Sequence, residues 1–351
     1  IADVKMKADF PTERWFWFDP PFHPNQSVLL HRQPDNVWRI DFQLGWNADP
    51  VEAVKPENVL PRIRALLGPD AQFDLEWVSV YTFACERMDK FRHGRVVFAG
   101  DSAHRVSPFG ARGANSGVQD AENLAWKLKL VLAGLAPDAL IDSYSDEREY
   151  AADENILNSS RATDFITPKS DISRSFRNAV LNLAKTHPFA RSLVNSGRLS
   201  LPATYTASPL NTPDTDAFTG RMVPGAVALD APITLNGEKD WWMAQLDGGF
   251  VLALFCGSAL PDSDTQSALQ ALRLGAVPVK TVLVVDPQCD VSGLAADLPV
   301  VADVEGCLSK RYDAQAGTAY LIRPDQHIAA RWRAFNADAL AAAVKRATGH
   351  A

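Results

Sequence analysis

The segment spanning residues 94–128 constrains the fold more than any other part of the chain. It reads GRVVFAGDSAHRVSPFGARGANSGVQDAENLAWKL. The apolar run over residues 95–99 predicts a short buried strand that delivers Asp101 at its carboxyl end. A loop rich in Gly and Pro follows, and then a helix from about residue 117 to 133. Open α/β sheets bind ligands at the carboxyl ends of their strands, so this segment predicts a ligand site.

The expected helix carries two further signals. Ser116 and Gln119 have the spacing of a capping box, which places the helix start at this point. Gly110, Gly113 and Gly117 let the backbone approach a ligand closely, and free N–H groups at a helix start attract a negative group. The apolar positions of the helix share one face: Val118, Ala121, Leu124, Ala125, Leu128, Val131 and Leu132.

The same segment resembles the second FAD fingerprint of the class A flavoprotein aromatic hydroxylases, the p-hydroxybenzoate hydroxylase-like family. Within that family it is most similar to the 3-(3-hydroxyphenyl)propionate hydroxylases. Ser102, Ser107 and Ala111 depart from the family pattern, the last two in the loop that would face the flavin. The matching positions are Gly100-Asp101, Ala103-His104, Pro108, Gly110, Gly113, Asn115, Gly117, Asp120-Ala121, Asn123-Leu124 and Trp126-Lys127-Leu128.

The resemblance implies an FAD-dependent monooxygenase that uses NAD(P)H and O2 to hydroxylate a phenolic or other aromatic substrate. Asp101 would accept hydrogen bonds from the ribityl chain of the cofactor. Pro108 and Phe109 would line the flavin ring on the side where oxygen reacts, and the backbone from Gly113 to Ser116 would face its negatively charged edge. The implied cofactor-binding residues are Gly100, Asp101, Pro108, Gly110, Gly113, Ala114, Asn115 and Ser116.

The resemblance also implies an α/β fold: part of a glutathione-reductase-type FAD-binding domain with an antiparallel substrate-binding sheet. Apolar and polar residues alternate from Trp38 to Leu44, as in a half-buried strand. The order of helices and strands after residue 220 looks thioredoxin-like. We therefore expect four segments: a substrate-binding sheet (1–88), the carboxyl-terminal part of the FAD-binding domain with a helical extension (89–200), a Pro-rich linker (201–219) and a thioredoxin-like domain (220–351).

Three residues of the first segment are candidates for contact with the substrate: Trp17, Arg39 and Gln43. Trp17 belongs to an aromatic cluster that more often forms sheet core. Arg39 and Gln43 share a strand face with Asp41, and a solvated face is the default interpretation of that pattern. The acidic run over residues 146–154 is likewise expected to be a solvated helix face.

The chain contains no GxGxxG motif, which in the family holds the ADP half of FAD. We therefore expect a βαβ-rich amino-terminal segment, in the same polypeptide or in a separate chain, as a partner. An alternative from another class is a module that only binds or dimerises. A third interpretation keeps the flavoprotein and replaces the phenol by a polyketide-type aromatic. A homodimer is left open.

Composition excludes several other classes. Of 351 residues, 35 are basic and 42 acidic, and the net charge of −7 argues against a nucleic-acid partner. No apolar run reaches the length of a membrane span. The four cysteines lack a CxxC pair, so we expect reduced thiols, a cytoplasmic location and no redox role for Cys256.

Two other kinds of site can be read in the sequence. Asp101, Ser102 and His104 are the ingredients of a hydrolase triad, but neighbours on one turn rarely converge, and a hydrogen bond that positions the loop is the preferred role of His104. His23 with His31, or His93 with His104, could hold a metal, but no Cys or carboxylate has the supporting spacing. We therefore expect no metal site.

Overall fold

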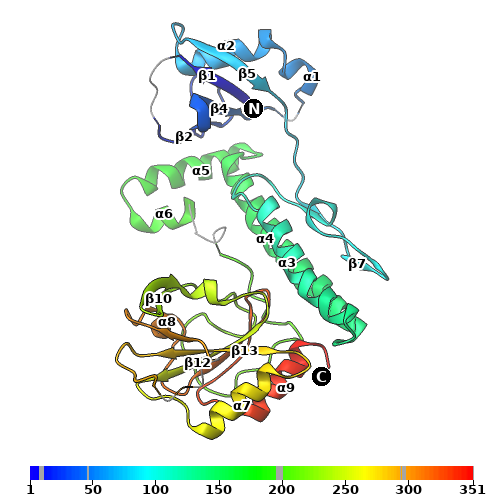
Figure 1. The fold of residues 1–351 in the computed structure, drawn as a ribbon. Coiled ribbons are helices and arrows are strands. Elements are labelled where there is room, and N and C mark those ends of the chain that lie inside the picture. The colour runs from blue at the N-terminus through cyan, green and yellow to red at the C-terminus, as the bar shows by residue number, and fades with distance from the viewer. Residues whose placement is uncertain (8–11, 46, 195–200, 293, 295–297, 351) are drawn as a thin grey trace. The chain divides into compact units, whose positions relative to one another are not determined.

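The computed structural model describes residues 1–7, 12–45, 47–194, 201–292, 294 and 298–350. Figure 1 shows the chain as a ribbon. The chain divides into two compact units. The first comprises Ile1–Cys85, Val106–Phe109 and Asn158–Arg198, and the second comprises Glu86–Arg105, Gly110–Leu157 and Leu199–Ala351. Both units mix helices and strands, and the elements of each are given in turn.

The first unit is built on a five-stranded antiparallel sheet in the order β2-β3-β4-β1-β5. One face packs against helix α2, and its core includes Val4, Leu30, Trp38, Ile40 and Ile63. The alternation predicted for β4 is confirmed, because its remaining side chains lie on the opposite face. The bounds are β1 (Ala2–Met6), β2 (Trp15–Trp17), β3 (Val28–Arg32), η1 (Pro34–Asn36), β4 (Val37–Phe42), α1 (Pro50–Ala53), α2 (Pro56–Leu67) and β5 (Phe73–Val78).

The first unit also contains the last turns of helix α4 (Asp142–Ile166), with α5 (Asp171–Ala184) and α6 (Pro188–Val194). The sequence over residues 172–194 favours a single helix, whereas the structure has two. Pro188 begins the second helix, because its ring has no N–H to continue the first.

The second unit opens with two short hairpins and a pair of helices. The strand predicted over residues 95–99 is wrong in extent: β8 has only two residues, and Val96 is 56% exposed. It pairs with β7 alone. The bounds are β6 (Glu86–Arg87), β7 (Arg92–His93), β8 (Val96–Val97), η2 (Gly100–Ser102), β9 (His104–Arg105), α3 (Gly113–Leu132) and η3 (Asp138–Ile141), followed by α4.

The rest of the second unit is a seven-stranded mixed sheet in the order β11-β10-β14-β13-β12-β15-β16. Helices α7 and α9 pack on one face, and α8 with η5 packs on the other. The sequence missed the short strands β10, β11 and β14. The bounds are β10 (Pro232–Leu235), β11 (Glu238–Trp241), η5 (Trp242–Gln245), β12 (Phe250–Gly257), α7 (Ser263–Arg273), β13 (Val279–Val285), β14 (Val300–Ala302), α8 (Cys307–Arg311), β15 (Ala319–Ile322), β16 (Ile328–Trp332) and α9 (Ala337–Ala347).

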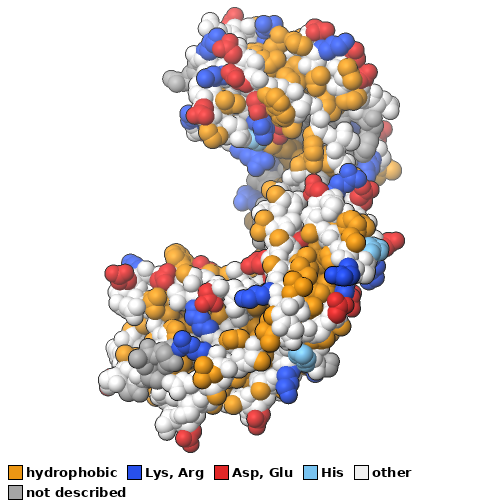
Figure 2. All heavy atoms as spheres, turned by 45° about the vertical axis from the view of Figure 1, so that its right-hand side comes forward, with side chains coloured by type: hydrophobic (Ala, Val, Ile, Leu, Met, Phe, Trp, Pro, Cys, Tyr) orange, Lys and Arg blue, Asp and Glu red, His pale blue; other side chains and the backbone are white. Residues whose placement is uncertain are grey.

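Helix α3 exposes much of its apolar face. Val118 is 68% and Leu132 is 84% exposed, and Ala121 and Ala125 lie between them on the same exposed side. Figure 2 shows hydrophobic side chains on the surface of this part of the molecule. The buried residues of the helix are mainly polar: Ser116, Asp120, Asn123, Trp126, Lys127 and Leu130. The buried face therefore needs polar partners, which the next helix and the sheet domain supply.

None of the helices within the described residues combines the length and the apolar character that crossing a membrane would require.

Candidate functional site

Gly100 and Gly117 bring the start of α3 against the η2 turn. Gly100 has φ +60°, a conformation that favours glycine, and an added Cβ at Gly117 would lie 3.5 Å from the Gly100 Cα. Such a contact is ordinary in distance but leaves little room for a larger side chain. The two glycines therefore set how closely the turn that carries Asp101 lies to the helix.

Asp101 presents a carboxylate without a partner. The residue is exposed, and no hydrogen bond or ion pair involves its side chain within the described part of the chain. The other two members of the imagined triad do not converge on it. The Ser102 hydroxyl donates to the Ala99 carbonyl at 2.7 Å, and His104 is buried. Asp101 is therefore free to accept hydrogen bonds from a ligand.

The first N–H groups of α3 are also free of side-chain caps. The capping box predicted at Ser116 and Gln119 is wrong, since the helix begins one turn earlier, at Gly113, with Arg112 as an N-cap that makes no side-chain cap bond. The Ser116 hydroxyl instead accepts a hydrogen bond from Asn155. A 20-residue helix with an uncapped start directs N–H donors and its positive dipole end outward.

The Asp120 carboxylate of α3 accepts hydrogen bonds that hold the η2 turn in place. One of its oxygens accepts the Gly100 N–H at 2.8 Å and pairs with the His104 Nε2 at 2.7 Å. Burial alone would raise the pKa of Asp120, but the hydrogen bond from His104 and the charge of Arg148 lower it. The loop-positioning role preferred for His104 is therefore confirmed.

Arg148 extends the network to the carboxyl-terminal part of the unit. Its guanidinium donates to Asp120 at 2.5 Å, to the Tyr205 hydroxyl at 2.6 Å and to the Ser116 carbonyl at 3.2 Å. The Tyr205 ring stacks on His327 with 4.5 Å between centroids. The helix start thus rests on side chains that come from distant parts of the sequence.

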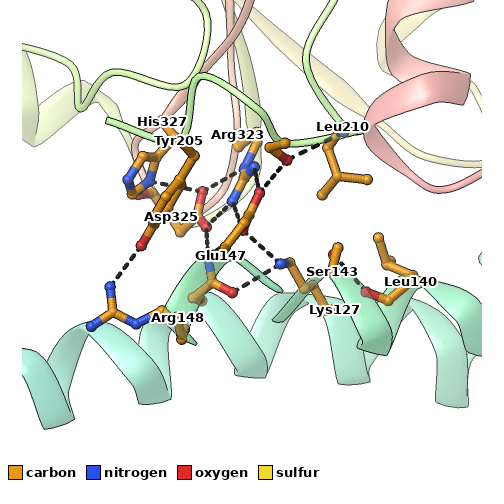
Figure 3. Close-up of polar contacts among 12 residues, drawn as sticks. Lys127, Leu140, Ser143, Glu147, Arg148, Tyr205, Leu210, Arg323, Asp325 and His327 are labelled. Atoms are coloured by element: carbon orange, nitrogen blue, oxygen red, sulfur yellow. Dashed lines mark hydrogen bonds and ion pairs between the residues drawn. The ribbon is translucent and has the colours of Figure 1, made fainter. Parts of the chain in front are cut away.

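A second buried network lies beside the first (Figure 3). Arg323 donates to Glu147 and to Asp325, and Lys127 donates to Glu147 at 2.8 Å and to Asn123 at 2.9 Å. The solvated helix face expected for residues 146–154 is therefore wrong at 147–149, where all three charged side chains are buried. Their partners lie up to 176 residues away, and no local spacing signals such pairs.

The pKa values in this second network follow from burial and pairing. Burial lowers the pKa of Lys127 to about 8. Burial would raise the pKa of Glu147, but the charges of Arg323 and Lys127 hold it well below its usual range. Lys127, Glu147 and Arg323 are therefore three buried groups whose opposite charges stabilise one another.

One cavity of about 450 Å³ opens beside the start of α3 in the second unit. Several residues of the implied cofactor set line it, namely Gly110, Asn115 and Ser116, together with Arg148, Tyr205 and His327. Gly110 (φ +98°) and Ala111 (φ +52°) both have left-handed conformations, which turn the chain sharply into the helix.

A second cavity, of about 560 Å³, lies within the first unit against the open face of its sheet. Pro108, Phe109 and Gln43 line it, as do Phe16, Leu29, Asp41, Tyr81 and Phe83. The rings of Phe83 and Phe109 meet edge to face with centroids 6.2 Å apart. The volume is that of a typical small-molecule pocket, and several aromatic side chains are among the residues that line it.

The other two substrate candidates lie elsewhere. Trp17 packs edge-to-face against Trp15 and Phe22 beside the sheet core. Arg39 donates through two nitrogens to the Asp3 carboxylate, both at 2.8 Å. Asp41 shares the strand face of Arg39 and Gln43, on which the sequence allows a polar pocket residue, and it lines the cavity although only the other two were named as substrate candidates. The alternation of β4 was the available signal, because it puts Asp41 on the face opposite the core.

A family described as "FAD binding domain" matches residues 3–159. A probable NADH-specific resorcinol 4-hydroxylase of Rhodococcus jostii is 46% identical over 149 residues, which cover 42% of this chain and 27% of that protein. The 6-methylpretetramide 4-monooxygenase of Streptomyces rimosus is 31% identical over 94% of this chain and 58% of its own length. The chain thus spans little more than half of such relatives at most.

Solved structures share the fold along the whole chain. The flavin-dependent monooxygenase PieE, in complex with FAD and substrate, matches with a TM-score of 0.74 at 21% identity, over 100% of this chain and 65% of its own. Aklavinone-11 hydroxylase with FAD and aklavinone matches with a TM-score of 0.73 at 22% identity, over 99% and 62%. The resemblance expected from the residues of the fingerprint is confirmed.

Proposed function

We propose that this chain, which is similar to flavin-dependent aromatic hydroxylases, forms part of an FAD-dependent monooxygenase. In this proposal the enzyme consumes NAD(P)H and O2 and hydroxylates a phenolic or related aromatic ring. The names of its relatives cover resorcinol, hydroxyphenylpropionate and polyketide-type substrates. The proposal takes a phenolic ring as the shared feature of the substrate.

The observation that carries this proposal is the juxtaposition of two unpartnered features. The free carboxylate of Asp101 lies in a turn that Gly100 and Gly117 hold against the uncapped start of α3. A carboxylate suits the hydroxyl groups of a ribityl chain, and a helix start suits the electron-rich edge of a flavin ring. The donors and acceptors present therefore fit FAD.

We assign the binding roles accordingly. Asp101 accepts hydrogen bonds from the ribityl hydroxyls, and the N–H groups of Gly113, Ala114 and Asn115 hold the ring edge. A helix start stabilises a nearby anion by about 0.3–1 kcal/mol, and by up to ~2 kcal/mol when the anion is partly buried. Gly100, Gly110 and Ser116 shape the backbone around them. When bound, the flavin would accept a hydride from the nicotinamide and activate oxygen.

The cavity of 560 Å³ takes the aromatic substrate in this proposal. Pro108 and Phe109 keep water from the reacting ring, and Gln43 contributes a polar group to the lining. Gln43 accepts hydrogen bonds from the Ser27 N–H at 2.9 Å and hydroxyl at 3.0 Å, which fixes its position. Trp17 and Arg39 act indirectly: they support the strands that carry the cavity residues.

We also propose the finer architecture. Residues 1–88 are the substrate-binding sheet and 89–200 the carboxyl-terminal part of a glutathione-reductase-type FAD-binding domain with its helical extension. Residues 201–219 link them to a thioredoxin-like domain over 220–351. The α7 and α9 layer on one face of the sheet and α8 on the other support the last assignment. The four free cysteines support a cytoplasmic location.

A βαβ-rich partner segment, in a longer polypeptide or a separate chain, completes the cofactor site in this proposal. The exposed apolar face of α3 supports this idea, because Val118 and Leu132 would be covered by such a segment. The dinucleotide phosphates of FAD need a second, Gly-rich helix start that the described residues do not supply. Dimerisation through the same face is the competing use of this surface.

Flavin titration tests the proposal. Residues 1–351 alone should bind FAD weakly, and addition of the FAD-binding amino-terminal segment of a relative, fused or separate, should tighten binding by at least about tenfold. The completed protein should then consume NADH or NADPH faster when a phenol is present. A completed protein that stays colourless after FAD is added would refute the proposal and leave a binding module in its place.

A further inference from the structure

Asp41 is a half-buried acid without a hydrogen-bond partner in the wall of the 560 Å³ cavity. Its Oδ1 is shielded from solvent and no described group donates to it. No hydrogen bond or ion pair within the described residues involves either carboxylate oxygen. Buried carboxylates are normally paired, so this one needs an explanation.

The neighbours of Asp41 on the sheet are committed elsewhere or uncharged. Arg39, two residues along β4 on the same face, gives both of its hydrogen bonds to Asp3. The residue directly opposite on β3 is Leu29. His31 lies diagonally across, and burial lowers its pKa, which favours the neutral ring. The amino group of Ile1, which also lines the cavity, is the cation that acts most strongly on Asp41, but it donates to the Ser79 carbonyl at 2.9 Å. Within the described residues, no cation forms an ion pair with Asp41.

The rest of the cavity indicates the kind of group that would pair with it. The residues that line the cavity include five aromatic side chains, Phe16, Phe42, Tyr81, Phe83 and Phe109. Lys169 is the one lysine or arginine among the described residues of the wall, and it pairs with Asp164 at 2.9 Å. The other cation among the described residues of the wall, the Ile1 amino group, donates to the Ser79 carbonyl. A negatively charged guest would therefore meet the unpaired carboxylate without a free lysine or arginine to offset it. The walls therefore favour a flat, uncharged guest that carries a donor.

We infer that Asp41 accepts a hydrogen bond from a ring hydroxyl of the substrate, so that the cavity selects uncharged hydroxylated aromatics over aromatic acids. This inference rests on the proposed function and narrows it. Among the substrate types named by the relatives, it favours resorcinol-like and polyketide-type phenols over hydroxyphenylpropionate. A hydroxyl is a better guest than an ammonium, because its transfer from water to an aromatic cavity costs much less.

The test compares resorcinol with its dimethyl ether, in which methyl groups replace both hydroxyl hydrogens so that neither oxygen can donate a hydrogen bond. Binding of each to residues 1–351 is measured by calorimetry without flavin, for the parent, Asp41→Leu and Asp41→Asn. The parent should bind resorcinol about tenfold more tightly than the ether. In Asp41→Leu this preference should fall to about one, while Asp41→Asn, which keeps an amide oxygen as acceptor, should retain part of it.

Asp74→Asn is the matched control, since it removes a carboxylate of the first unit that lies outside the cavity wall and pairs with Lys7. It should leave the preference for resorcinol unchanged. Benzoate should bind the parent more weakly than it binds Asp41→Asn, because only the parent carries the opposing charge. Melting curves identify any variant that fails to fold. If Asp41→Leu does not fold, the comparison uses Asp41→Asn, whose side chain has the same shape as that of Asp41.

An equal preference in the parent and in both Asp41 variants would overturn the inference, as would a parent that binds neither ligand. Neither result bears on the flavin titration, which involves Asp101 and the start of α3. Conversely, a chain that never binds FAD would refute the proposed hydroxylase while the resorcinol preference could still be measured. The two failures are therefore distinguishable.

Discussion

Arg323 donates hydrogen bonds to both carboxylate oxygens of Glu147, at 2.6 and 2.9 Å. The two residues come from the loop after β15 and from α4, and both are almost completely shielded from solvent. The pair therefore fastens the seven-stranded sheet to the helices that carry the proposed cofactor turn.

Removal of one partner of this pair should be costly. Glu147→Gln leaves Arg323 and Lys127 with less opposing charge in a buried site, and broken buried pairs cost about 3–5 kcal/mol. Urea denaturation should show a loss of that size. Asp153→Asn, which breaks the more exposed pair with Arg87, is the control and should cost less than about 1 kcal/mol. A similar loss in both variants would show that the buried network adds nothing special.

The same network should make the protein sensitive to acid. Pairing with Arg323 lowers the pKa of both Glu147 and Asp325 against the opposing effect of burial. A lowered pKa in the folded state gives stability that is present above the unfolded value, 4.5 for Glu147, and is lost as the pH falls below it. The melting temperature should therefore drop steeply below that pH, and less steeply in Glu147→Gln. Parallel profiles for the two proteins would contradict this explanation.

Asp41 should have the opposite effect on stability. Burial raises its pKa, so the carboxylate disfavours folding once the pH exceeds the unfolded value of 3.8. Asp41→Asn should therefore melt a few degrees higher than the parent at neutral pH, and the difference should vanish in acid. Asp74→Asn, at an exposed pair with Lys7, should change little at any pH. A lower melting temperature for Asp41→Asn would mean that the charge has a partner.

Cys256 should be chemically inert. Burial raises the pKa of its thiol to about 12, so very little thiolate exists at neutral pH. Iodoacetamide should label Cys307, which is only half buried, well before Cys256, and peptide mapping would measure the order. Rapid labelling of Cys256, or a reversible disulfide with Cys289 during turnover, would contradict the structural role assigned to this domain.

Local patterns predicted much of the fold. The alternation of β4 appears in the structure as expected, since it depends on contacts nearby in the chain. The errors arise where contacts between residues far apart in the sequence determine which side chains are buried. The apolar positions of α3 share one face, as the spacing predicts, but the helix buries Asp120, Asn123 and Lys127 instead, because their partners come from α4 and from the loop after β15.

The site was predictable to a similar degree. The fingerprint located Asp101 and the glycines, because close backbone approaches require particular residue types at fixed spacing. Asp41 and Arg148 carry no such local signature. Their importance depends on what faces them, an aromatic cavity in one case and the Asp120 carboxylate in the other. Only the folded arrangement reveals these neighbours.

The central claim is that Asp101 and the start of α3 hold a flavin. Its most direct test is a titration of FAD into the completed protein, that is, the chain with its amino-terminal partner segment, in the parent, Asp101→Ala and Ser102→Ala. Asp101 accepts hydrogen bonds from the cofactor in this account, so Asp101→Ala should weaken FAD binding by at least about tenfold with an unchanged melting curve. Ser102→Ala restores the usual residue of the family and should bind like the parent. Parental affinity in Asp101→Ala would contradict the claim, and so would a variant that simply unfolds.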